Sequence, residues 1–246
     1  MLSEHDLRNA LERAGLEAPV RFDEVTRSTQ ETALALAAAG APQWSLVAAA
    51  HQTAGRGRLG RAWTDEPGRA LMFSFVLRPD LSPERGGLLT LLAGVALAEA
   101  VREVAGAAAG CKWPNDLLVG DGRVAGILAG SEVSDDRFDH VVIGVGVNLD
   151  PPPGVPGAAG LGDCDEGELL AEFLVRFRLG YERPDAIVDI YKEVCVTLGE
   201  DVRATTMDGR TIQGRAVDID ETGGLIIETE SRREVVRSGE VLYLRL

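Results

Sequence analysis

Near Gly199 the chain changes from mixed helical and strand patterns to a series of short strand patterns. Asp208-Gly209 and Gly223-Gly224 are dipeptides typical of the turns that join such strands. A small β-barrel is the expected packing, because closing a sheet hides the edges of its strands. We therefore predict two domains, residues 1–198 and 199–246, with strands in the second at 202–206, 211–219, 225–229, 234–236 and 241–244.

Helices and strands are interleaved in the predicted first domain. Helical patterns occupy residues 3–14, 28–40, 87–104, 166–179 and 184–198. Strand patterns occupy residues 20–25, 45–50, 70–77, 116–119, 124–133 and 139–147. The turn-rich residues 120–123 predict a hairpin between two of these strands. The expected architecture is α+β, with a mixed but mostly antiparallel sheet flanked by helices.

The composition permits a large buried core, because 45% of the 246 residues are hydrophobic. No apolar run approaches the ~20 residues that span a bilayer, and the N-terminus lacks the basic and then apolar layout of a signal peptide. We expect a cytoplasmic protein with no membrane partner. The three cysteines have no metal-ligand spacing, so neither a disulfide framework nor a zinc site is indicated.

Residues 52–63, which read QTAGRGRLGRAW, combine three glycines with three arginines and end in an indole. Glycines let backbone N–H groups surround an anion, and arginine offers a planar charged fork, so the run is typical of an anion-closing loop. A flexible basic surface loop, or a segment that touches nucleic acid, fits this run alone equally well. The net charge of −14 argues against broad attachment to nucleic acid, so we expect the arginines to act locally.

Further motifs follow in order: KWPND at residues 112–116, GIL at 126–128 and GVGVN at 144–148, with Ser28-Thr29 ahead of them all. Together with the glycine-arginine run, they resemble the biotin protein ligases over most of the chain. This resemblance implies a catalytic domain like those of class II aminoacyl-tRNA synthetases, followed by an SH3-like C-terminal domain. It also implies a reaction that uses ATP and Mg²⁺ to join biotin, through biotinyl-5′-AMP, to a lysine of the biotin carboxyl carrier domain of acetyl-CoA carboxylase or a related carboxylase.

The resemblance also assigns roles to individual residues. The implied catalytic residues are Lys112, Arg56, Arg58 and Asp116. The implied biotin-binding residues are Ser28, Thr29, Gln52, Gly55, Arg56, Lys112, Gly126, Ile127 and Gly144. The implied ATP and adenylate contacts are Arg58, Arg61, Trp63, Asn115, Arg123 and Asn148. Metal ligands are not assigned, and Mg²⁺ is expected with the ATP phosphates, with Asp116 as the candidate carboxylate beside it.

Elementary chemistry supports a cationic site independently. A carboxylate that attacks the α-phosphorus of ATP meets like charge, so neutralising cations are the main catalytic requirement. Purely structural roles stay open for several of these residues: N-capping for Ser28, a solvent-exposed charge for Lys112, core packing for Trp63, and a turn for Asp116.

Two residues depart from the pattern expected of the family. Gln30 stands where an asparagine usually follows Ser-Thr, and Arg123 stands where a lysine usually precedes Gly-Ile-Leu. An arginine at this place keeps the charge but changes its reach and geometry, so a direct catalytic role for Arg123 stays open.

Two other functions compete with biotin ligation. A lipoate–protein ligase would share the fold and the adenylation chemistry, although the loop and the KWP motif favour biotin. A biotin-responsive repressor is disfavoured, because only 27 residues precede Ser28, too few for a three-helix DNA-binding module with its linker. We therefore expect no nucleic-acid partner. Homodimers, which occur in the family through a sheet edge, stay open.

Overall fold

The structure, a computed structural model, describes residues 2–244 and is built on a seven-stranded sheet. The strand order is β1-β2-β3-β7-β6-β5-β4. β1 pairs with β2 in parallel and every other pair is antiparallel, so the predicted mixed, mostly antiparallel sheet is confirmed. The strands are β1 (Val20–Asp23), β2 (Leu46–Ala49), β3 (Ala70–Leu77), β4 (Ala109–Lys112), β5 (Asp116–Val119), β6 (Gly122–Ser134) and β7 (Arg137–Asn148).

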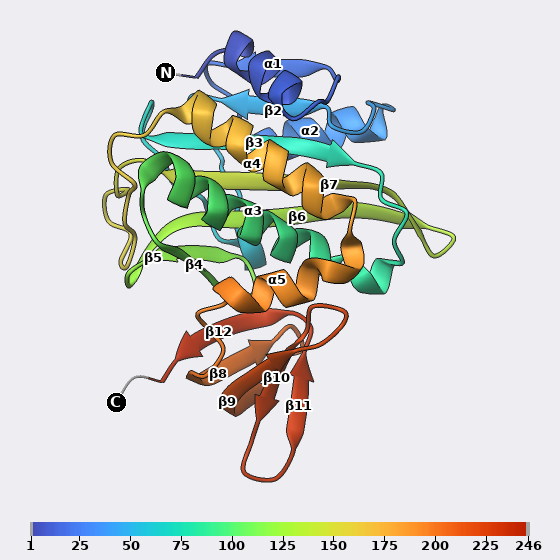
Figure 1. Ribbon diagram of the computed structural model, residues 1–246, viewed down its shortest axis with the longest axis vertical. Helices are drawn as coiled ribbons and strands as arrows, with labels where there is room; N and C mark the ends of the chain where they lie inside the picture. The colour runs from blue at the N-terminus through green and yellow to red at the C-terminus, as the bar shows by residue number, and fades with distance from the viewer. Residues whose placement is uncertain (1, 245–246) are drawn as a thin grey trace.

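Helices cover the two faces of this sheet unequally. α1 (Glu4–Arg13), α3 (Gly87–Ala105) and α4 (Glu166–Tyr181) lie on one face, and the short α2 (Thr29–Ala38) lies on the other (Figure 1). α1 begins with a capping box, in which the Ser3 hydroxyl accepts from the Asp6 N–H and the Asp6 carboxylate accepts from the Ser3 N–H. None of the helices in residues 2–244 is long and apolar enough to cross a membrane.

Alternation along β3 and β7 separates the core from the opposite face. Phe73, Phe75 and Ile143 pack in the main hydrophobic core with α1, α3 and α4. Ser74 and Gly144, which are paired across the two strands, point to the other face, because successive side chains of a strand alternate. At this pair the α2 face of the sheet carries small residues, whereas Val76 and Val142 beside it pack against α2.

The five strands predicted after Gly199 are confirmed as one antiparallel sheet, in the order β11-β10-β9-β8-β12. No hydrogen-bonded pair joins β11 to β12 within residues 2–244, so the pairing leaves the sheet open along that line. The strands are β8 (Asp201–Thr206), β9 (Thr211–Ile219), β10 (Leu225–Glu228), β11 (Arg233–Val236) and β12 (Gly239–Tyr243).

The helix predicted at 184–198 is shorter in the structure. A 3-10 turn at Pro184–Ala186 leads into α5 (Ile187–Val194), after which the chain leaves the helix and the Val196 N–H donates to the Cys111 carbonyl at 3.0 Å. Pairing with β4 therefore replaces the last helical turn. Sequence patterns did not reveal β4, the partner that makes this pairing possible.

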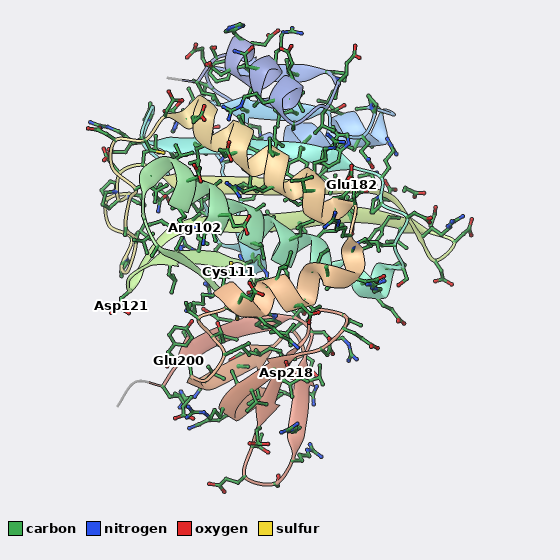
Figure 2. All side chains as sticks on the ribbon, in the orientation of Figure 1. Arg102, Cys111, Asp121, Glu182, Glu200 and Asp218 are labelled. Carbon is green, nitrogen blue, oxygen red and sulfur yellow. The ribbon has the colours of Figure 1, made fainter. Side chains whose placement is uncertain are left out.

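Side-chain contacts from Trp113 and from α5 hold the C-terminal sheet to the large one. The Trp113 indole N–H donates to the Gly223 carbonyl at 2.9 Å, and its backbone N–H donates to the Thr197 hydroxyl at 2.9 Å. Lys192 of α5 pairs with Asp218 at 2.6 Å, and Figure 2 labels Asp218 on the C-terminal sheet beside α5. The large sheet therefore presents its β4–β5 end to the C-terminal sheet.

Candidate functional site

A cavity of about 200 Å³ lies on the α2 face of the large sheet. The glycine-arginine loop, the start of α2, the strands β4–β7 and β12 of the C-terminal sheet all contribute to its walls. It brings together most of the residues expected from the sequence: Ser28, Thr29, Gln52, Arg56, Arg58, Arg61, Trp63, Lys112, Asn115, Asp116, Arg123, Gly126, Ile127 and Gly144. Both the loop and the KWPND motif therefore serve one site.

Glycines allow the Trp63 indole to lie against the sheet. Gly126 and Gly146 are paired across β6 and β7. A Cβ atom on Gly146 would lie 2.6 Å from two atoms of the indole, and one on Gly126 would lie 3.2 Å from it. Larger residues would push the ring away, so the two glycines set the place of Trp63 in the cavity wall.

Gly55, for which the sequence predicts a contact with biotin, does not line the cavity. It is buried behind the loop, where a Cβ atom would lie 2.5 Å from the Trp63 carbonyl oxygen. The Trp63 N–H donates to the Gly55 carbonyl at 3.0 Å. Gly55 lets the two arms of the loop pack closely and so acts on Trp63.

Hydrogen-bonding groups gather at the α2 end of the cavity. The Gln52 side-chain oxygen accepts from the Thr29 N–H at 2.7 Å and from the Thr29 hydroxyl at 3.2 Å. Ser28 is the N-cap residue of α2, but its hydroxyl makes no capping bond, contrary to the capping pattern expected there. The Ser28 Oγ atom is buried with no hydrogen-bond partner among the described residues. A buried hydroxyl at a cavity wall is free to bond a polar ligand.

Three loop arginines are held by different elements. Arg56 pairs with Glu31 of α2 at 3.2 Å, and Arg61 pairs with Glu240 of β12. Arg58 donates to the Asn115 side-chain oxygen at 2.9 Å. Burial lowers the pKa of Arg58, against the opposing effect of the Asp116 carboxylate. A guanidinium partly removed from water interacts more strongly with an anion than an exposed one does.

Lys112 and Arg123 supply two further cations. The Lys112 ammonium lies 4.8 Å from the ring centroid of Tyr243, and within residues 2–244 no carboxylate forms an ion pair with it. Arg123 donates to Asp116 at 3.4 Å and lies 5.7 Å from the Trp63 ring centroid. Lys112 thus lies at the cavity over an aromatic ring and without an ion pair among the described residues, whereas Arg123 is paired with Asp116.

Asn148 was expected to contact adenine, but it does not line the cavity. Its side chain is buried, and its amide N–H₂ donates to the carbonyls of Arg123 at 3.3 Å and Ala159 at 3.1 Å. These bonds tie the Asn148 amide to the backbone of Arg123 and Ala159.

Ser74 and Glu240 are cavity residues that the sequence did not single out, and Gln30 was noted there only as a departure from the family pattern. Ser74 and Gln30 line the α2 end, and Glu240 comes from the C-terminal sheet. The strand alternation through 70–77 could have indicated Ser74 as a polar residue on the face opposite Phe73 and Phe75. No local pattern marks Glu240, because its place depends on how the two sheets pack.

Comparisons with known proteins agree with this geometry. Residues 22–148 match the biotin/lipoate A/B protein ligase family, and residues 197–243 match the biotin protein ligase C-terminal domain. The chain is 36% identical to the biotin–[acetyl-CoA-carboxylase] ligase of Mycobacterium tuberculosis, over 99% of this chain and 96% of that protein. It is 32% identical to the bifunctional ligase/repressor BirA of Bacillus subtilis, over 98% of this chain and 78% of that protein.

Solved structures give the same result. The biotin protein ligase of Aquifex aeolicus, solved in complex with biotin and ATP, superimposes with a TM-score of 0.76 at 28% identity, over 93% of this chain and 99% of that one. Both family matches, the full-length relatives and this shared fold show that the chain belongs to the biotin protein ligase family.

Proposed function

We propose that the protein activates biotin with ATP to give biotinyl-5′-AMP and then transfers biotin to a lysine of a biotin carboxyl carrier domain of acetyl-CoA carboxylase or a related carboxylase. The observation that carries this proposal is one cavity with two chemically different ends. Hydrogen-bonding side chains from Ser28, Thr29 and Gln52 meet there with Arg56, Arg58, Arg61, Lys112 and Arg123. A polar ring head with an acidic tail, next to a triphosphate, is the combination that such a cavity fits.

The cations account for the first step. A carboxylate oxygen of biotin attacks the α-phosphorus of ATP, and the bond from that phosphorus to the bridging oxygen breaks to release pyrophosphate. Lys112 would neutralise the carboxylate and the α-phosphate as they approach, and Arg58 would bond the phosphate in a bidentate manner. In the second step the amine of the acceptor lysine attacks the acyl carbon and AMP leaves, with Asp116 placed to hold or deprotonate the amine.

Mg²⁺ fits this site as a companion of ATP. Magnesium sites of ATP enzymes commonly use one or two carboxylates together with substrate phosphates and water. Within residues 2–244 no group of three or more His, Cys, Asp or Glu side chains could hold a metal, while Asp116 lines the cavity as a single carboxylate. When bound, the ion would neutralise triphosphate charge and Asp116 would hold it.

Several expectations from the sequence stay predictions: the carrier domain as acceptor, a cytoplasmic location, a homodimer through a sheet edge, the absence of a nucleic-acid partner and the domain boundary at 198/199. The chain covers 78% of the Bacillus ligase/repressor, so its alignment omits part of that protein.

Incubating the protein with ATP, Mg²⁺ and either biotin or lipoate, with mass spectrometry of the acyl-adenylate, tests the proposed reaction. Adenylate from lipoate alone would contradict it. Adding an isolated carrier domain then tests transfer.

Ser28→Ala should weaken biotin binding without lowering stability. The buried hydroxyl has no hydrogen-bond partner among the described residues, so its removal leaves no group of the protein unsatisfied. Loss of one hydrogen bond to biotin costs about 1 kcal/mol, or roughly fivefold in Kd. Calorimetric titration with biotin, with a thermal melt as control, measures both effects. A lower melting temperature with unchanged biotin affinity would assign Ser28 to helix capping instead.

Arg123→Lys should keep most of the activity. The half-buried Arg123–Asp116 contact is long, at 3.4 Å, and pairs of this kind contribute about 0–1 kcal/mol. Lysine keeps the positive charge that the family usually places there. The measurement is kcat/KM for adenylate formation, with the uncharged Arg123→Met as the comparison. A loss in Arg123→Lys above about a hundredfold, or roughly 2.7 kcal/mol, would show that the site depends on guanidinium geometry.

A further inference from the structure

The paired strands β6 and β7 form the floor of the cavity. The Gln30 side chain covers one end of this floor and the Trp63 indole covers the other. Along β6 and β7 the paired residues run from Gly126–Gly146, beneath Trp63, through Leu128–Gly144 to Gly130–Val142. A Cβ atom on Gly144 would lie 2.3 Å from Gln30 Oε1, and one on Gly130 would lie 3.1 Å from Gln30 Nε2. The Gln30 amide therefore fills the space that these two glycines leave open.

Hydrogen bonds fix the orientation of this amide. Gln30 Nε2 donates to the Val142 carbonyl at 3.1 Å, and Oε1 is within reach of the Ser74 hydroxyl at 3.3 Å. The Ser74 hydroxyl also lies 2.9 Å from the Thr29 hydroxyl, to which it can donate. Gln30 is 5% exposed, so a swing into solvent would require these buried bonds to break. The amide is thus a fixed wall rather than a mobile side chain.

We propose that Gln30 limits how far the ring of biotin enters the cavity, and that it thereby selects the acid by the size of its ring. This inference rests on the proposed function, which places the ureido ring among Ser28, Thr29 and Gln52. Ser74 joins Gln30 to Thr29, so the amide stands directly behind the groups that would bond this ring. Because the Trp63 indole and the Gln30 amide close the two ends of the floor, the distance between them limits the size of the ring that the bound acid can carry.

Two substitutions separate size from hydrogen bonding. Gln30→Asn keeps the amide but is one methylene shorter, which opens space above Gly144 and Gly130. Gln30→Met has nearly the original length without the amide, so it keeps the wall and loses the two hydrogen bonds. If the size of the Gln30 side chain limits the ring of the acid, Gln30→Asn relaxes this limit and Gln30→Met does not.

The test compares biotin with biotin methylated on a ureido nitrogen, by pyrophosphate release in the presence of ATP and Mg²⁺. The ratio of kcat/KM for the methylated acid to that for biotin should rise by about tenfold or more in Gln30→Asn, because one methylene in a pocket changes discrimination by roughly 10–200-fold. Gln30→Met should keep the ratio of the parent protein. The KM for ATP should be unchanged in both variants.

An unchanged ratio in Gln30→Asn, or an equal rise in both variants, overturns the role of Gln30 while the proposed function stands. Absence of biotin-dependent pyrophosphate release from the parent protein overturns the proposed function, and this inference with it. Thermal melts of both variants show that the comparison is made on folded protein.

Discussion

Lys112→Ala should fold like the parent protein and lose most of its adenylation activity. The ammonium lines the cavity, lies over the Tyr243 ring and has no ion-pair partner among residues 2–244, so its charge is available to the reacting carboxylate and phosphate. Removing a cation that serves a charge-developing step raises the barrier by on the order of 2–4 kcal/mol. Single-turnover formation of biotinyl-5′-AMP measures the effect.

The sequence supplies a matched control, because Lys192 is the only other lysine of the chain. Lys192 pairs with Asp218 between α5 and the C-terminal sheet, outside the cavity. Lys192→Ala should therefore leave adenylation near the parent rate and affect only stability. Equal single-turnover rates for Lys112→Ala and the parent protein would remove Lys112 from the chemistry and leave it as a strand-end charge.

Arg58→Gly should still form biotinyl-5′-AMP but release it faster and label unrelated proteins. Arg58 is tied to Asn115 at 2.9 Å and reaches the cavity from the loop, where the adenylate phosphate would be held. Hydrogen bonds to charged groups contribute about 1.5–3 kcal/mol, so release should accelerate by roughly tenfold to a hundredfold. The measurements are the adenylate dissociation rate and biotin on a lysine-rich bystander protein.

Arg58→Ala distinguishes the guanidinium from loop flexibility. Glycine also increases the backbone freedom of a loop that already contains Gly57 and Gly60, whereas alanine does so less. If the arginine holds the adenylate, both variants release it early. Parent-like retention in Arg58→Ala would assign the effect to backbone freedom, and parent-like retention in both would contradict the role of Arg58 in holding the adenylate.

Local patterns predicted the secondary structure well where residues alternate or recur regularly. The strand at 70–77 coincides with β3, and the helix at 87–104 differs from α3 by one residue at its end. β4 was missed because its four residues, Ala-Gly-Cys-Lys, carry no alternation and few strand-favouring side chains. Its pairing with β5 and with residue 195 stabilises it instead.

Sequence motifs predicted which segments meet in the cavity better than which side chains face it. Gly55 and Asn148 belong to the same motifs as Arg56 and Gly144, yet they do not line the cavity and instead contact Trp63 and the Arg123 backbone. A sequence motif indicates that a residue type is needed at a position. It does not show whether that residue contacts the ligand or contacts a neighbouring residue such as Trp63 or Arg123. The sequence did not predict Glu240 as a cavity residue for a different reason, since packing between the two sheets places it beside Arg61.

The participation of β12 in the cavity has a consequence for synthesis of the chain. The walls begin at Ser28 and include Glu240 and Val241, which are separated by almost the whole sequence. A ribosome that has made the large sheet and its helices has not yet added β12, which carries the ion-pair partner of Arg61. Translation products that stop before β12 would therefore lack one wall of the cavity, so the site is complete only when nearly the whole chain has been synthesised.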